Sequence, residues 1–178
     1  IGVVNLSTPR VDDTAWKIAA VGDVTGDGKA DIVWQHDTGP LALWRMNGTT
    51  NMAGSALVGD PAMAYDPRWR VVGIADMNGD KQMDLLWQHE AGWLSAWLMY
   101  AGNVFGVQSL NPVAEFDTAW RVVGVLDTNL DDKPDILWQQ ATNGNLVLWH
   151  MDGLTRTGTA DVVGGSIGAP QWKVVGPK

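Results

Sequence analysis

Short apolar runs alternate with clusters of turn residues along the whole chain. The runs are four to eight residues long, rich in β-branched and aromatic residues, and bounded by Gly, Asp and Asn. Runs of this length and composition are typical of β-strands. A helical solenoid needs amphipathic runs of ten or more residues, and the chain has none. The pattern therefore predicts an all-β protein.

The runs repeat with a period of about fifty residues, which is the first thing to establish in a chain of short strands. The segments WKIAAVGDVTGDGKADIVWQH, WRVVGIADMNGDKQMDLLWQH and WRVVGVLDTNLDDKPDILWQQ begin at Trp16, Trp69 and Trp120. A last segment, WKVVG, begins at Trp172, so the intervals are 53, 51 and 52 residues. Each unit is expected to fold in the same way.

The unit that begins at Trp69 shows the strand pattern most clearly. Its apolar runs predict strands over Trp69–Ala75, Asp84–Gln88 and Leu94–Met99, with a weaker fourth strand near Val107–Leu110. Four short strands in about fifty residues, repeated along the chain, match one blade of a β-propeller. The predicted fold class is thus all-β, made of four-stranded antiparallel blades.

The repeat register divides the chain into three full blades and two partial ones. We assign residues 1–15 to the tail of a preceding blade, 16–68 to blade 1, 69–119 to blade 2, 120–171 to blade 3, and 172–178 to the first strand of a further blade. Propellers usually close with four to eight blades. We therefore expect either a piece of a longer array or a chain that completes its ring by self-association.

Tryptophan is unusually frequent, with 11 Trp against 2 Tyr and 2 Phe. Ten of these Trp occupy repeat positions, and those in the middle of the second strand are interpreted as core packing between blades rather than a platform for sugars. Trp93 has no counterpart in the other units, so it is the Trp that we expect to be most exposed. The base that follows each first Trp is interpreted as a side chain that covers neighbouring apolar surface.

An acidic loop recurs between the first and second strands of every unit. Carboxylates stand at relative positions 1, 5 and 9, an amide or hydroxyl oxygen stands at position 3, and a backbone carbonyl is available at position 7. Such a set of hard oxygen ligands suits Ca²⁺, which takes six to eight oxygens, better than the smaller Mg²⁺. The fifteen predicted metal-site residues are Asp23, Thr25, Asp27, Lys29, Asp31, Asp76, Asn78, Asp80, Gln82, Asp84, Asp127, Asn129, Asp131, Lys133 and Asp135.

The alternative is that these loops are simple turns, since Asp, Asn and Gly all favour turn conformations. The glycines are irregular at positions 4 and 6, whereas the carboxylates recur three times, so we interpret the ligand set as the repeated feature. An EF-hand needs Glu at position 12 and flanking helices, but position 12 here is Trp and the flanks are predicted strands. We therefore expect up to three bound Ca²⁺ ions.

These units resemble FG-GAP or VCBS repeats, the calcium-loop blades similar to those of the integrin α-subunit propeller and of some propeller lectins. The stretch DMNGDKQMDLLWQHEAGWLSAWLM carries the resemblance most closely. It implies calcium at Asp76, Asn78, Asp80 and Asp84, and at the equivalent residues of the other units. Thr25 and Leu130 depart from the family pattern.

Composition narrows the classes of function. The formal net charge of −8 disfavours nucleic acid and anionic membranes as partners, and no apolar run is long enough to enter a membrane. The absence of cysteine excludes disulfides and thiol catalysis. None of the three histidines lies in a recognisable catalytic motif, so we expect a protein that is not an enzyme.

We expect a secreted, calcium-binding module for recognition or adhesion, with a protein or glycan ligand. Extracellular calcium sites bind in the millimolar range and are empty in the cytosol, which is the reason to expect a secreted protein. Two alternatives stay open. The chain is a structural unit that assembles through its partial blades, or it is an accessory domain of a larger secreted enzyme.

Overall fold

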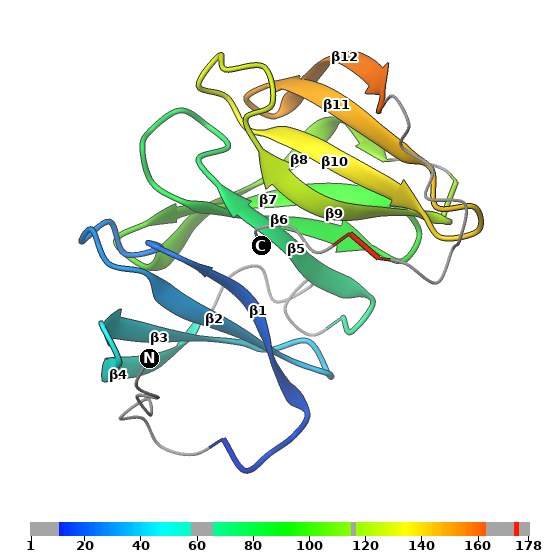
Figure 1. Cartoon of the computed structure of the whole chain (residues 1–178). Helices are drawn as coiled ribbons and strands as arrows, with labels where there is room; N and C mark the ends of the chain where they lie inside the picture. Colours follow the sequence, from blue (N-terminus) through cyan, green and yellow to red (C-terminus); the bar gives the residue numbers. More distant parts are fainter. Residues whose placement is uncertain (1–10, 58–65, 115–116, 163–172, 175–178) are drawn as a thin grey trace, which may run out of the picture.

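The computed structural model describes residues 11–57, 66–114, 117–162 and 173–174, and this part of the chain is entirely β-structure (Figure 1). No helix in it is long and apolar enough to span a membrane. The twelve strands are β1 (Trp16–Gly22), β2 (Asp31–His36), β3 (Leu41–Asn47), β4 (Thr50–Leu57), β5 (Trp69–Ala75), β6 (Asp84–His89), β7 (Trp93–Tyr100), β8 (Asn103–Ala114), β9 (Trp120–Leu126), β10 (Asp135–Gln140), β11 (Leu146–Asp152) and β12 (Thr155–Asp161).

Each unit folds into a four-stranded antiparallel meander, as a propeller blade does. The first forms a sheet of its own in the order β1-β2-β3-β4. The second and third share an eight-stranded sheet, β5-β6-β7-β8-β12-β11-β10-β9, because their outer strands meet in parallel where Asn111 faces Thr155. The predicted all-β class of propeller-like blades is confirmed. The two partial blades fall mostly on residues outside the described ranges.

The second unit matches its predicted strands except at its outer edge. Strand β5 coincides with the prediction, whereas the fourth strand runs over Asn103–Ala114 and is much longer than expected. A tight turn at Ala101 and Gly102, both with positive φ, leads directly into this strand. Most of its side chains are exposed, so the apolar pattern from which strands are predicted is weak there.

Each blade has tryptophan side chains on one face and aliphatic side chains on the other, and these two faces pack together to form the core between blades. One face of the second unit carries Trp87 and Trp97, which are fully buried against Val33, Leu41 and Leu43 of the first unit. The tryptophan face of one unit thus covers the aliphatic face of the unit before it.

The same packing recurs between the second and third units. Trp138 and Trp149 lie against Leu86, Leu94 and Leu98 in a second cluster. The interpretation of the mid-strand tryptophans as core is therefore confirmed for Trp87 and Trp138. Burying such side chains is worth about 1.5–3 kcal/mol each, so these faces supply most of the cohesion between units.

The first strands of neighbouring units also approach closely. A Cβ atom on Gly73 of β5 would lie 2.3 Å from Cγ2 of Val125 on β9, which is far inside van der Waals contact. A Cβ atom on Gly22 of β1 would lie 3.0 Å from Cδ1 of Ile74 on β5. At Gly73 a side chain would displace Val125, whereas at Gly22 a small shift of the Ile74 side chain would make room.

A buried glutamine joins each unit to the next. Gln35 on β2 donates from Nε2 to the Trp69 carbonyl oxygen at 2.9 Å and accepts at Oε1 from the Val71 amide at 3.2 Å. One side chain thereby forms hydrogen bonds with two backbone groups of β5. We call this arrangement the glutamine clamp.

The clamp repeats at the next interface. Gln88 on β6 donates to the Trp120 carbonyl oxygen at 3.0 Å and accepts from the Val122 amide at 3.1 Å. In the third unit, Gln139 accepts from the Val174 amide at 3.2 Å. Val174 stands two residues after Trp172, as Val71 does after Trp69, so the clamp also receives the start of the final repeat.

We expect Gln88→Leu to destabilise the chain by about 3 kcal/mol, because it leaves the buried Val122 amide without its partner and removes one of two donors to the Trp120 carbonyl oxygen. A loss of this size corresponds to a fall in melting temperature of roughly 10 °C for a chain of this length. Thermal unfolding followed by circular dichroism measures it. Gln108→Leu on the exposed part of β8 is the matched control and should change the melting temperature little. Equal effects of the two substitutions would argue against the clamp.

Candidate functional site

The three acidic loops connect the first and second strands of the three units. They span residues 23–31 between β1 and β2, 76–84 between β5 and β6, and 127–135 between β9 and β10. Position 9 of each loop is the first residue of the second strand. The structure thus places all fifteen predicted site residues in the same place in each blade.

The aspartate at position 1 organises the backbone of its own loop. In the second unit, Oδ1 of Asp76 accepts from the amides of Gly79 at 2.7 Å and Asp80 at 3.0 Å, and Oδ2 accepts from Lys81 at 2.7 Å. Asp23 and Asp127 make the same three contacts with positions 4, 5 and 6 of their loops. A single carboxylate therefore holds each loop in its curled form.

Positions 3 and 5 form a second contact within the loop. Asn78 Nδ2 donates to Asp80 Oδ2 at 3.0 Å, and Asn78 Oδ1 accepts from the Asp80 amide at 2.9 Å. Asn129 and Asp131 repeat this pair. In the first loop Thr25 stands at position 3, and its hydroxyl is buried without a hydrogen-bond partner.

Position 7 contributes its backbone in every loop. Its amide donates to the position 5 carboxylate, at 2.9 Å for Lys29, 2.8 Å for Gln82 and 3.0 Å for Lys133. The Lys133 ammonium reaches outward to Asp152 at 2.8 Å. The Lys29 ammonium instead turns back to the Asp27 carboxylate of its own loop, 3.5 Å away. A lysine ammonium has no lone pair for a cation, so Lys29 and Lys133 can serve a cation only through their carbonyl oxygens.

The aspartate at position 9 ties the loop to the third strand and is fully buried in all three units. Asp84 Oδ1 accepts from the Met99 amide on β7, and Oδ2 accepts from the Met77 amide in the loop, both at 2.9 Å. Asp31 and Asp135 accept in the same way from Met46 and Met151. This carboxylate makes the loop, the second strand and the third strand one unit.

Two of the buried carboxylates, Asp84 and Asp135, have pKa values shifted in opposite directions. Burial raises the pKa of Asp84 to about 6, against the hydrogen bonds from Met99 and Met77, and the charges of Asp80 and Asp76 also raise it. Burial acts in the same direction at Asp135, but the hydrogen bonds that it accepts outweigh burial and lower its pKa.

The extra partners of Asp135 explain this difference. The Thr128 hydroxyl and the His150 Nδ1 atom, 3.3 Å away, both reach its Oδ2 atom. Met77 and Leu98 stand at the corresponding positions of the second unit and offer no such groups.

The backbone of the loops repeats as faithfully as their carboxylates. Positions 4 and 6 have positive φ in every loop, at Gly26 and Gly28, at Gly79 and Lys81, and at Leu130 and Asp132. The interpretation that only the ligand set repeats was therefore incomplete, since the turn geometry repeats even where glycine is absent. The position 1 carboxylate compensates for the strain through its three backbone hydrogen bonds.

The carboxylates of each loop lie near one another without converging on one point. Across the described residues, no three His, Asp or Glu side chains meet in a group that could hold a metal ion. In each loop the position 1 carboxylate bonds to loop amides, and the position 9 carboxylate bonds to an amide of the third strand. In the second and third loops the position 3 side chain bonds to position 5. The oxygen chemistry fits calcium, and the buried hydroxyl of Thr25 without a partner is a further hard donor in the first loop.

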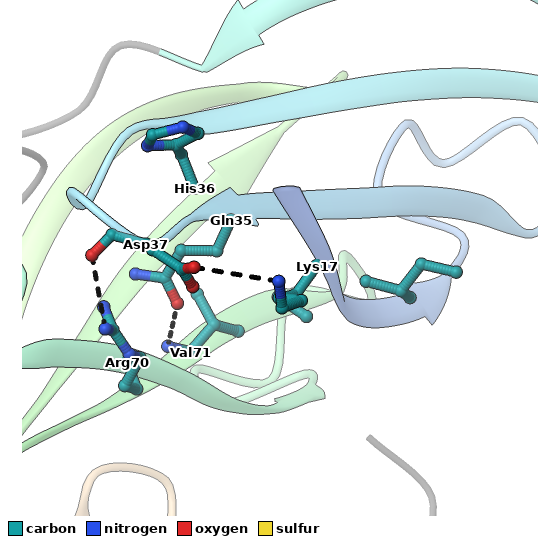
Figure 2. Close-up of a pocket in the computed structure, with 8 residues that line it drawn as sticks. Lys17, Gln35, His36, Asp37, Arg70 and Val71 are labelled. Atoms are coloured by element: carbon teal, nitrogen blue, oxygen red, sulfur yellow. Dashed lines mark hydrogen bonds and ion pairs between the residues drawn. The ribbon is translucent and has the colours of Figure 1, made fainter. Parts of the chain in front are cut away.

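A second polar feature, which the sequence interpretation missed, lies beside each glutamine clamp. Between the first two units, a pocket of about 150 Å³ is lined by Lys17, Gln35, His36, Asp37 and Arg70, among others (Figure 2). Between the second and third units, an equivalent pocket of about 90 Å³ includes Arg70, Gln88, His89, Glu90 and Arg121. The sequence feature that could have revealed it is a glutamine that recurs in the apolar second strand of each unit, in the segments VWQH, LWQH and LWQQ.

Trp93 is 47% exposed, as expected, but it begins β7 rather than lying in a hairpin turn. Its ring stacks on His89, with the ring centroids 4.8 Å apart. The imidazole of His89 is buried, and its Nε2 atom has no hydrogen-bond partner, although the Asp66 carboxylate lies 3.6 Å away.

Residues 23–87 match the family model of the FG-GAP-like repeat, which confirms the resemblance drawn from the sequence. The match begins at the first residue of one acidic loop and ends after the next loop, on Trp87 of β6. It therefore covers two loops and the glutamine clamp between them. No curated protein matches the chain.

We expect Leu130→Gly to stabilise the chain by about 1 kcal/mol, because Leu130 has a φ of 63° and is 89% exposed. Its side chain strains the backbone and buries little surface in return. The reciprocal substitution Gly79→Leu, at the same position of the second loop, should destabilise by a similar amount. Chemical denaturation of both variants measures the effect. A Leu130→Gly variant less stable than the parent would contradict the strain.

Proposed function

We propose that this chain, which carries an FG-GAP-like repeat over residues 23–87, is a calcium-binding module that acts in recognition outside the cell. The observation that supports the proposal is that three loops of different sequence adopt one conformation around the same set of oxygen side chains. Asn, Ser and Thr side chains can also bond to the backbone of a turn, so turn formation by itself does not require three carboxylates in each of three copies.

The proposed ligands of the second loop are the side-chain oxygens of Asp76, Asn78, Asp80 and Asp84 and the carbonyl oxygen of Gln82. Each carboxylate has about four lone-pair sites, so a carboxylate that accepts backbone hydrogen bonds still has capacity for a cation. The other two loops offer the same positions. Calcium tolerates flexible geometry with six to eight oxygens, which suits a loop whose ligands must draw slightly closer to bind it.

The proposed effect of calcium is to strengthen a connection that the chain already makes. Asp84 links its loop to β7 through the Met99 amide. When bound, a cation supplies positive charge that offsets the repulsion between this buried carboxylate and its neighbours Asp80 and Asp76. Because the cation binds the folded loop, it stabilises the fold by mass action.

The proposed location follows from the expected affinity. Sites on exposed loops of extracellular modules bind calcium at about 10⁻⁴ to 10⁻³ M, a level found outside cells and not in the cytosol. We propose a role in recognition rather than catalysis, because the described histidines bond to nearby aspartates or backbone and none faces a serine or a second base in a catalytic arrangement.

A second candidate function, assembly of units from separate chains, is favoured by the outer faces of the array. Trp34 and Trp44 on the tryptophan face of the first unit are half-buried and line a pocket of about 130 Å³. Leu137 and Leu148 on the aliphatic face of the third unit are also half-buried. Their counterparts between units are buried, so a further unit of this kind fits either face.

Calcium at 10 mM should raise the melting temperature by on the order of 10 °C relative to a chelator, if three sites of this affinity are filled. Differential scanning calorimetry with calcium, magnesium or chelator measures the shift. Magnesium should have a smaller effect because it demands a tighter octahedron. An unchanged melting temperature with and without chelator would refute the proposal.

A matched variant separates calcium binding from general electrostatics. The triple substitution Asp27→Asn, Asp80→Asn and Asp131→Asn keeps the oxygen that accepts the position 7 amide and removes one charge per loop. It should melt like the parent in chelator and lose most of the calcium response. The control with Asp37→Asn, Glu90→Gln and Asp161→Asn has the same net charge and leaves the loops intact, so it should keep that response.

Assembly predicts that the sedimentation coefficient rises with protein concentration. Leu148→Lys on the aliphatic face of the third unit should abolish the rise, because it places a charge in the proposed contact. Val107→Lys, at an exposed position of β8, is the matched control. A monomer at all concentrations would argue against this second candidate and would leave the calcium proposal untouched.

A further inference from the structure

A row of basic side chains crosses the starts of the first strands. Lys17 lies on β1, Arg70 on β5 and Arg121 on β9, each directly after the Trp that opens the strand. Lys173 occupies the same place in the final repeat. All four residues are exposed, so their charged groups are open to solvent.

The glutamine clamps make this row continuous. Lys17 is the direct cross-strand partner of Gln35. Gln35 in turn bonds to the Trp69 carbonyl and the Val71 amide, the two backbone groups on either side of Arg70. Lys17 and Arg70 are therefore held next to each other, on the two sides of one buried amide.

The same register repeats along the array. Arg70 is the cross-strand partner of Gln88, which bonds to the backbone on both sides of Arg121. Arg121 is the partner of Gln139, which bonds to the amide next to Lys173. One basic residue per unit is thus fixed in line with the next. We call Lys17, Arg70, Arg121 and Lys173 the basic row.

Pockets open between members of the row. Figure 2 shows Lys17 and Arg70 on two sides of the first pocket, with Asp37 between them. The Lys17 ammonium lies 3.7 Å from the Asp37 carboxylate, and Arg70 Nη2 donates to the Asp37 carbonyl oxygen at 3.4 Å. The second pocket lies between Arg70 and Arg121 and also contains Arg68.

The guanidinium groups in the row lack acidic partners. Within the described ranges, neither Arg70 nor Arg121 has a carboxylate within 4.0 Å, and both donate to backbone carbonyl oxygens. Neighbouring like charges repel one another unless an anion compensates them. The chain has a net charge of −8, so these two guanidinium groups without a carboxylate partner stand out among its described residues.

We infer that the basic row binds an acidic polysaccharide, through carboxylate or sulfate groups that enter the pockets between units. A guanidinium matches both groups with paired hydrogen bonds. One cation per unit calls for a ligand whose anionic groups also repeat along a chain. Duplex nucleic acid fits less well, because it carries a charge every 1.7 Å or so, which is much denser than one basic residue per unit.

This site is separate from the acidic loops. The basic row marks the start of each first strand, whereas the loops follow the end of that strand. Binding to the row therefore does not depend on calcium in the loops. Binding measured in chelator tests the row by itself, and the calcium melts test the loops.

The test uses four probes at low salt and in chelator: polygalacturonate, dextran sulfate, neutral dextran and a 20-nucleotide oligo-dT. Isothermal titration calorimetry should show binding to one or both anionic polysaccharides and none to neutral dextran. The first two probes distinguish a carboxylate ligand from a sulfate ligand. Each of Arg70→Gln and Arg121→Gln should weaken binding about fivefold, and the double variant about 25-fold. Raising the salt concentration should weaken binding steeply.

The control is Arg45→Gln with Lys81→Gln, which removes two exposed bases outside the row and should leave affinity nearly unchanged. Arg70→Lys with Arg121→Lys keeps the charge but loses the paired hydrogen bonds, so its affinity should lie between those of the parent and the double Gln variant. Three results would overturn the inference: no binding to either anionic polysaccharide, equal losses in the control and the double variant, or oligo-dT binding as tightly as the polysaccharides.

Discussion

A buried glutamine that bonds to the backbone of the next unit is the interaction on which the rest of this structure depends. Gln35 and Gln88 each bond to a carbonyl oxygen and to a buried amide of the following unit. These bonds fix the position along its strands at which one blade meets the next. At that position the tryptophan and aliphatic faces pack against each other, and only there can Gly73 approach Val125 closely.

In the acidic loops, too, one side chain forms hydrogen bonds with several backbone groups. The aspartate at position 1 curls the loop, and the buried aspartate at position 9 ties it to the third strand. The loop is thus shaped by its own hydrogen bonds, so the calcium binding that we propose would require little further ordering of the loop. The buried carboxylate is what makes the loop sensitive to positive charge, since burial disfavours its ionised form.

The sequence predicted the blades well because their signal is local. Strand β5 and the position of each loop follow from apolar runs and turn residues that the chain repeats three times. The length of β8 was not predictable in this way, because an exposed edge strand lacks the apolar pattern. The candidate ligands were found by their spacing, but their hydrogen bonds to loop amides depend on backbone conformation. Leu130 adopts the left-handed geometry typical of glycine, which its residue preference would not suggest.

The contacts between units escaped the sequence interpretation for a different reason. A glutamine in a strand is unremarkable by itself, and only its partner in the following unit, 34 residues further along for Gln35 and Trp69, reveals its role. The basic row depends on the same partners, since Lys17 and Arg70 become neighbours only when the clamp sets the register.

The glutamine clamp recognises only main-chain atoms of the strand that it receives. Main-chain atoms are the same whatever side chains follow, so the receiving unit can change its sequence without breaking the joint. If the gene gains or loses one copy of the repeat, each new pair of neighbouring units still has a glutamine and the main-chain groups to which it bonds. The length of such an array is free to vary during evolution, while the joint between neighbours stays constant.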